Sequence, residues 1–132
     1  MAALAVDDQL AIQQLYARYN HAIDSGNGDG WAECFTADGT FNSGAAGMFT
    51  GTEALANFAK GFAERLKARH WTNNLVLDAA DGGAWGSCYL ILLRLGDKEH
   101  PTSILTTGIY RDTLVKDASG WKFSNRTVTP DA

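Results

Sequence analysis

The sequence is poor in the residues and runs that mark several classes of protein. It has 2 cysteines and 2 prolines in 132 residues, and its 3 histidines show no His-x-x-x-His spacing. A disulfide framework and a structural zinc site are therefore both unsupported. Cys34 and Cys88 lie in the apolar stretches "WAECF" and "SCYLILL", where buried free thiols are common. We expect neither a disulfide nor a bound metal or other cofactor.

Long hydrophobic runs and an excess of basic charge are also absent. The N-terminal "MAALAVDDQL" has no positive start, and its short apolar run ends at Asp7 and Asp8, so we expect neither a signal peptide nor a membrane span. The chain carries 11 basic and 15 acidic residues for a net charge of −4. Dispersed basic residues argue against nucleic acid as the main partner. These features predict a cytoplasmic protein that binds neither membranes nor nucleic acid.

Hydrophobic residues, by contrast, make up 45% of the chain, which is enough for one packed core. The length predicts a single domain over residues 1–132. The N-terminal half has helical periodicity. Apolar residues recur at three- and four-residue steps over 7–24, where Asp7 and Asp8 supply charge and capping oxygens, and again over 52–68, where Thr52 is the expected cap. A short helix is expected over 29–36.

The C-terminal half changes to a strand pattern. Four β-rich segments are separated by turn signals: 69–79, 84–96, 103–116 and 120–128. Short strands are expected within 37–44 and 47–51. Helices followed by strands predict an α+β fold, in which a curved antiparallel sheet wraps over three N-terminal helices as a cone. The open mouth of such a cone is a natural ligand site.

The stretch "HAIDSGNGDGW", residues 21–31, leaves three roles open for Asp24: metal ligand, turn-former or catalyst. Ser25, Asn27, Asp29 and Gly30 fall at positions one, three, five and six of an EF-hand-like loop, but the first position lacks its carboxylate and Thr36 occupies the position that needs a glutamate. A phosphate-binding loop does not fit, because the glycines follow a helix and no Gly-Lys-Ser/Thr comes after them. Asp24 lies near Tyr16 and Asn20 on the helix surface, at the border of the apolar face. A carboxylate at a helix C-terminus also needs a compensating partner, such as a histidine.

Four stretches resemble the SnoaL-like members of the nuclear-transport-factor-2-like superfamily, which includes scytalone dehydratase, hexachlorocyclohexane dehydrochlorinase and polyketide cyclases. They are "IQQLYARYNHAIDSGNGDGWAECFTADGTF", "FTGTEAL", "RHWTNNLVLD" and "GIYRDTLVKDASGWKFSNRTV", and the similarity covers nearly the whole chain. In dehydratase and dehydrochlorinase members, an aspartate ending the first helix pairs with a histidine opening the first long strand. Asp24 and His70 hold those positions here.

The resemblance implies that Asp24 orients His70 and that His70 is a general base inside the cone. A carboxylate bonded to one ring nitrogen fixes the tautomer that leaves the other nitrogen free to accept a proton. Without the resemblance, the residues favour a core or sheet-edge histidine at this position.

The sequence departs from both of these relatives. Scytalone dehydratase has a second catalytic histidine on a later strand, where this chain has Leu105, Thr106 and Thr107. The dehydrochlorinase has a lysine near the position of Tyr19 or Asn20. A two-histidine dehydration and a halide elimination are therefore both in doubt.

Five further residues are candidates for substrate binding. Tyr16, Tyr19 and Asn20 can supply hydroxyl or amide donors from the first helix, although tyrosines on an apolar stripe often pack in a core. Tyr110 and Arg126 lie on strands with alternating faces, so each has an even chance of pointing inward. An inward Arg126 would suit an anionic oxygen.

These observations predict a cofactor-independent lyase or isomerase for a small apolar, aromatic or polycyclic substrate. His70, assisted by Asp24, would remove a proton, with dehydratase-type elimination preferred and cyclase or retro-aldol chemistry as alternatives. A non-catalytic binding or assembly module, like the β subunit of a ring-hydroxylating dioxygenase, is the alternative from another class. The strand "CYLILLRL" is apolar on both faces, which predicts a homodimer or homotrimer.

Overall fold

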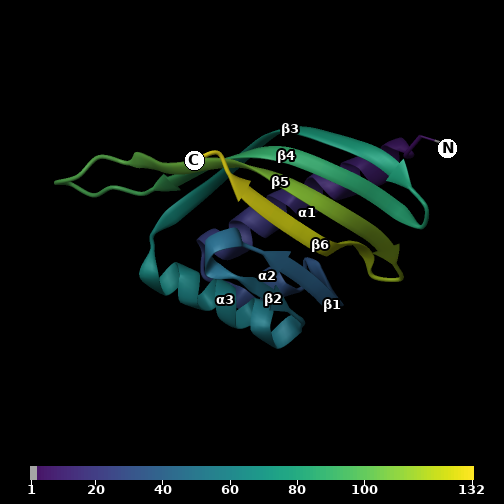
Figure 1. Ribbon diagram of the computed structural model, residues 1–132, viewed down its shortest axis with the longest axis horizontal. Coiled ribbons are helices and arrows are strands. Elements are labelled where there is room, and N and C mark those ends of the chain that lie inside the picture. Colours follow the sequence, from purple (N-terminus) through teal and green to yellow (C-terminus); the bar gives the residue numbers. More distant parts are fainter. Residues whose placement is uncertain (1–2) are drawn as a thin grey trace.

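A computed structural model describes residues 3–132, and within them three α-helices pack against one six-stranded sheet (Figure 1). The helices are α1 (Val6–Asp24), α2 (Gly28–Ala32) and α3 (Thr52–Arg65), with a short 3-10 helix, η1, at Gly44–Ala46. The strands are β1 (Phe35–Asn42), β2 (Met48–Thr50), β3 (Ala68–Ala80), β4 (Gly83–Arg94), β5 (Ser103–Asp117) and β6 (Gly120–Pro130). The predicted α+β architecture is confirmed.

The sheet is mixed rather than wholly antiparallel. Its strand order is β2-β1-β6-β5-β4-β3. The four long strands form the expected antiparallel series, but β1 and β6 run parallel. Parallel neighbours need a long crossover, and here α3 and three long strands lie between β1 and β6 along the chain. The sheet curves over α1 without closing, with β2 and β3 at its two edges (Figure 1).

Helix α1 supplies the stripe of apolar residues that packs under the sheet. Its buried apolar side chains include Ile12, Leu15, Tyr16, Tyr19 and Ile23. The predicted capping by Asp7 and Asp8 is wrong, because Ala5 is the N-cap and both aspartates lie inside the first turn. Asp8 instead accepts a hydrogen bond from Trp121 Nε1 at 3.0 Å, which ties β6 to the start of the helix.

Helices α2 and α3 pack against each other, and α3 also contacts β1. Trp31 of α2 is fully buried and packs against Phe35 and Phe41 of β1, with ring centroids 5.0 and 5.3 Å away. Thr52 is not the cap of α3, because the N-cap is Gly51. Gly51 has a φ of 90°, a conformation that favours glycine.

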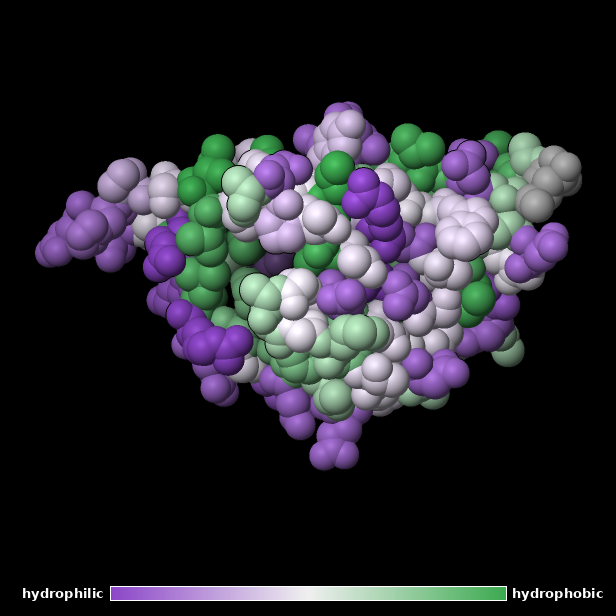
Figure 2. Space-filling model, in the orientation of Figure 1, coloured by the Kyte–Doolittle hydropathy of each residue, from purple (hydrophilic) through white to green (hydrophobic). Residues whose placement is uncertain are grey.

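Four further observations concern the cysteines, metal ligands, hydrophobic helices and the β4–β5 hairpin. Cys34 and Cys88 are both buried free thiols. Within residues 3–132, no three His, Cys, Asp or Glu side chains are grouped to hold a metal ion. None of the helices in this part of the chain has the length and apolar character needed to cross a membrane. The tip of the β4–β5 hairpin, at the left of Figure 2, is strongly hydrophilic.

Candidate active site

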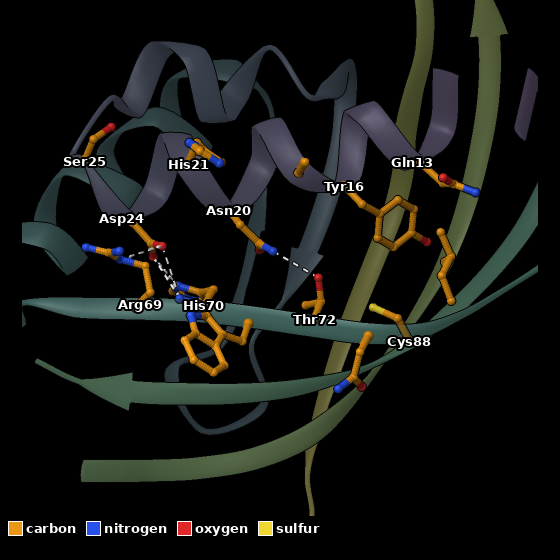
Figure 3. Close-up of a pocket in the computed structure, with 14 residues that line it drawn as sticks. Gln13, Tyr16, Asn20, His21, Asp24, Ser25, Arg69, His70, Thr72 and Cys88 are labelled. Atoms are coloured by element: carbon orange, nitrogen blue, oxygen red, sulfur yellow. Dashed lines mark hydrogen bonds and ion pairs between the residues drawn. The ribbon is translucent and has the colours of Figure 1, made fainter. Parts of the chain in front are cut away.

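A cavity of about 930 Å³ lies between α1 and the concave face of the sheet. Its wall is built from one face of α1, the start of β3 and the middle of β4 (Figure 3). The polar and thiol groups along it include those of Tyr16, Asn20, Asp24, His70, Thr72 and Cys88. The helical residues follow at four-residue steps and the two residues of β3 at a two-residue step, so each set shares one face of its element.

Asp24 and His70 meet at one end of this cavity (Figure 3). His70 Nδ1 lies 2.6 Å from Asp24 Oδ1. The backbone N–H of His70 also donates to both carboxylate oxygens, at 3.2 and 3.1 Å. The carboxylate that ends α1 therefore fixes both the start of β3 and the orientation of the imidazole. The His70 side chain is buried, with 6% of its surface exposed.

Two neighbours complete the surroundings of this pair. Arg69 Nε lies 3.8 Å from Asp24 Oδ2, with the arginine side chain 55% exposed. The ring of Phe62, on α3, packs 5.5 Å from the ring of His70. A carboxylate at a helix C-terminus is disfavoured by the helix dipole. The N–H donors of His70 and the charge of Arg69 compensate for that repulsion.

This arrangement is chemically suited to proton transfer. A carboxylate on Nδ1 selects the tautomer in which Nε2 carries the free lone pair, and imidazole titrates near neutral pH. Partial burial strengthens the interaction between the two groups, because little water screens it. The pair is thus able to accept a proton from a molecule held in the cavity.

A second link joins α1 to β3 one turn nearer the N-terminus of the helix. Asn20 Nδ2 donates to Thr72 Oγ1 at 3.0 Å (Figure 3). Asn20 is buried at 9% exposure, and Thr72 is half-buried. Asn20 was predicted as a cavity residue, whereas Thr72 was missed. The signal for Thr72 was its spacing, because residues two apart on a strand face the same side.

Tyr16 lines the inner part of the cavity, but its hydroxyl hydrogen is already engaged. The hydroxyl donates to Asp112 Oδ2 on β5. Burial, followed by the negative charge of Asp112, raises the pKa of Tyr16 far above its usual range. Tyr16 is therefore protonated at neutral pH and held in a fixed orientation.

The structure places the other three predicted site residues in the core, and none of them lines the cavity. Tyr19, Tyr110 and Arg126 are 0%, 2% and 0% exposed. The Arg126 guanidinium carbon lies 4.2 and 3.5 Å from the ring centroids of Tyr19 and Tyr110. Arg126 does point inward, but its Nε is 3.0 Å from Asp112 Oδ1, so its charge is already paired. It is not placed to meet a substrate anion.

Asp112 was not identified from the sequence as a buried carboxylate. Cys88 was predicted to be buried, but not to line the cavity. Asp112 lies on the same face of β5 as the buried Tyr110 and Leu114, at two-residue steps that mark the inward face. Burial raises the pKa of Asp112, against the opposing effects of Arg126 and Tyr16. Burial likewise raises the pKa of Cys88 to about 11. The Cys88 thiol therefore remains protonated, and a thiol in that form is a poor nucleophile.

Comparison with known proteins agrees with this fold. The sequence profile of the SnoaL-like domain matches residues 5–127. None of the curated proteins matches the chain. A solved structure of Rv3472 from Mycobacterium tuberculosis, a protein of unknown function, is 32% identical with a TM-score of 0.86, covering 97% of this chain and 76% of that one.

Two further solved structures have the same fold. Aln2 from a Streptomyces species is 25% identical with a TM-score of 0.86, covering 98% of this chain and 95% of that one. An NTF2-like protein with a cystatin-like fold from Novosphingobium aromaticivorans is 20% identical with a TM-score of 0.88, covering 96% and 83%. The low identity of the second structure makes its similarity informative about fold alone.

Proposed function

The chain belongs to the SnoaL-like family, and from that premise we propose that it is a cofactor-independent lyase or isomerase that acts by proton abstraction. His70 is the general base and Asp24 orients it. The preferred reaction is dehydratase-type elimination from a small aromatic or polycyclic substrate. Ring closure and retro-aldol cleavage begin with the same proton transfer, and they are the alternatives within this class.

The observation that carries the proposal is the hydrogen bond between Asp24 and His70 in the wall of a cavity. The bond of 2.6 Å uses Nδ1 of the imidazole, which leaves Nε2 as the basic nitrogen. The pair lies among the residues that line the cavity. A general base must lie within hydrogen-bonding reach of the proton that it removes, and the place of His70 in the cavity wall supports this role.

The size and lining of the cavity support the choice of substrate. Small-molecule sites have volumes of roughly 300–1,000 Å³ and are mostly apolar with a few polar groups. The cavity volume of about 930 Å³ lies near the upper end of that range. Ala17 and Leu75 contribute apolar wall between the polar positions. A fused-ring molecule with a few oxygen atoms fits such a lining.

The test uses 2-tetralone, a bicyclic ketone with exchangeable protons beside its carbonyl group, in D₂O. Nuclear magnetic resonance measures the rate at which the protein exchanges these protons for deuterium. His70→Ala is expected to lower that rate by about 10²–10⁴-fold, the usual contribution of a general base. Asp24→Asn is expected to lower it as well, because an amide does not hold the same tautomer.

His21→Ala is the matched control, because His21 is an exposed histidine on the same cavity's rim. The His21→Ala protein should exchange the protons of 2-tetralone at the wild-type rate. Circular dichroism shows whether each variant is folded. A folded His70→Ala protein with the wild-type exchange rate would contradict the assigned base. A ligand that binds but exchanges no proton in the wild-type protein would favour the non-catalytic binding module.

We also infer that the protein is a homodimer or homotrimer that associates through the outer face of its sheet. Trp71, Val76, Trp85 and Tyr89, on β3 and β4, are each more than half exposed. Large apolar side chains gathered on one face are typical of an association surface. Light scattering at micromolar concentration should give a multiple of the 14.2 kDa chain mass. Trp85→Lys should shift it toward the monomer, and a monomeric wild-type protein would contradict the inference.

A further inference from the structure

Two hydrogen-bonded side-chain pairs, here called rungs, join α1 to β3 along the cavity wall (Figure 3). The first rung is Asp24 with His70, and the second is Asn20 with Thr72. The helical residues are four apart and the strand residues two apart, so the rungs lie next to each other. In each rung a residue of α1 orients a residue of β3 that lines the cavity.

The second rung prepares the hydroxyl group of Thr72 as a donor. Thr72 Oγ1 accepts a hydrogen bond from Asn20 Nδ2 at 3.0 Å. A hydroxyl that accepts one hydrogen bond keeps its own hydrogen to donate to another group. Donating to Thr72 also fixes the Asn20 amide. The Asn20 Oδ1 atom is buried and has no partner within the described residues, as is common where a ligand completes a polar site.

We propose that Thr72 donates a hydrogen bond to a substrate carbonyl oxygen while His70 removes a proton from the carbon next to it. The electron pair of the broken C–H bond forms a carbon–carbon double bond, and the carbonyl oxygen takes the negative charge. The proton moves to Nε2 of His70, and the Thr72 O–H bond stays intact. This assignment rests on the proposed function and narrows its substrate to a ketone or related carbonyl compound with an enolisable proton.

The spacing of the two residues suits that substrate. Residues two apart on one strand face are about 7 Å apart. A carbon next to a carbonyl lies about 2.4 Å from the carbonyl oxygen, from bonds of about 1.5 and 1.2 Å. With a contact of about 3 Å at each end, to Nε2 and to Oγ1, such a fragment has a length similar to the backbone spacing of the two residues. The hydrogen bond from a donor at this place strengthens as negative charge develops on the oxygen, which favours the transition state.

The experiment compares Thr72→Val with Thr72→Ser in the 2-tetralone exchange assay. The valine variant keeps the shape of the side chain and loses the hydroxyl, so kcat should fall by about 10²-fold with little change in KM. The serine variant keeps the hydroxyl and should retain most of the rate. Thr40→Val is the control, because the Thr40 hydroxyl bonds to Thr50 on β2 and does not line the cavity.

A binding measurement separates charge stabilisation from structural damage. 2-Naphthol resembles the enol form of 2-tetralone, and naphthalene lacks the oxygen. Thr72→Val should weaken the binding of 2-naphthol and leave the binding of naphthalene unchanged. Equal losses for the two compounds would instead indicate a damaged cavity and overturn the proposal.

The outcomes for Thr72 and for His70 are distinguishable. If His70→Ala loses exchange while Thr72→Val keeps the wild-type kcat, the role of Thr72 is overturned and the general base stands. If the wild-type protein exchanges no protons above the buffer rate, or if His70→Ala exchanges them at the wild-type rate, the proposed function itself fails.

Discussion

Asp24 and Asp112 are both inward-facing carboxylates that pair with a basic side chain, but they lie in different surroundings. Asp24 is on the wall of the cavity with 11% of its side chain exposed, and Asp112 is in the core with 0% exposed. The partner of Asp24 is the imidazole of His70 at 2.6 Å. The partner of Asp112 is the guanidinium of Arg126 at 3.0 Å.

The basic partners, His70 and Arg126, differ in whether they are able to accept a proton. Imidazole gains and loses a proton near neutral pH, whereas guanidinium stays charged under all ordinary conditions. Burial is the largest single influence and lowers the pKa of Arg126, but Asp112 and, to a smaller extent, two tyrosines and Cys88 together raise it by more, so the net pKa is raised. Four aromatic rings, with centroids 3.5–4.9 Å away, also surround its guanidinium carbon. The core pair therefore has no free position for a ligand and no proton to exchange.

The comparison separates a pair that presents a free ring nitrogen to a cavity from a pair that is enclosed in the core. Tyr16 lies between the two regions, because it lines the cavity and donates to Asp112. Removing a partner from the core pair should therefore cost stability. Removing His70 should cost activity. Four variants test this division, in order of the expected change in stability.

The largest loss of stability is expected for Arg126→Met. It leaves Asp112 buried without its partner, which typically lowers the free energy of unfolding by about 3–5 kcal/mol. Urea denaturation measures this change. In the double variant Arg126→Met/Asp112→Asn both charges are absent and Tyr16 keeps an acceptor, so much of the loss should be recovered. A single variant as stable as the wild type would show that the core pair contributes nothing.

A smaller loss is expected for Tyr16→Phe. The change removes the hydroxyl that donates to Asp112 Oδ2. Hydrogen bonds to charged groups contribute about 1.5–3 kcal/mol, and the free energy of unfolding should fall by that amount. Tyr89→Phe removes a tyrosine hydroxyl from the exposed outer face. It should leave stability unchanged, and an equal effect of the two changes would argue against a special role for the Tyr16 bond.

A still smaller loss, about 1 kcal/mol or less, is expected for His70→Gln. Asp24 keeps the backbone N–H of residue 70 as a donor and Arg69 as a neighbouring charge. The same urea titration therefore gives a near-wild-type curve for a variant with greatly reduced proton exchange. A loss as large as that of Arg126→Met would make the pair on the cavity wall structural and would remove the distinction between the two regions.

Local pattern predicted most of the fold. The expected first helix, 7–24, agrees with Val6–Asp24, and each of the four long strands is found within a few residues of its expected bounds. The parallel pairing of β1 with β6 was missed. Periodicity reports which face of an element is buried, but it carries no information about which strand lies alongside.

The site was less predictable, because its partners are far apart in the sequence. Asp24 and His70 are 46 positions apart, and only the family resemblance indicated that they meet. The step of two residues places Asp112 on the buried face of β5, but nothing in that strand shows which group would pair with its carboxylate, because Arg126 comes from β6. Arg126 was a candidate for substrate binding if it pointed inward, and it does point inward, but it pairs with Asp112 instead.

The smallest change in stability is expected for Asp8→Asn, at the surface end of α1. Trp121 and then Lys116 bond to Asp8 and hold its pKa below the ordinary value of 3.8. Asp8 therefore releases its proton more readily in the folded chain than in the unfolded one. Its contribution to stability is present above pH 3.8 and is lost as the pH falls through the lowered pKa. The pH dependence of stability that comes from Asp112 has the opposite sign. Burial raises the pKa of Asp112, so its contribution to stability falls as the pH rises.

Thermal melting of wild type and Asp8→Asn between neutral and acidic pH measures this effect. The melting temperature of the variant should be slightly lower at neutral pH, and the two curves should converge in acid. Asp7→Asn removes a charge from the same helical turn and serves as the control. A difference that persists unchanged in acid would mean that Asp8 stabilises the helix without its charge. Convergence would show that the charge of Asp8 stabilises the fold by a small amount. The loss of stability on breaking the pair would then decrease from Asp112 in the core, through Asp24 on the cavity wall, to Asp8 at the surface.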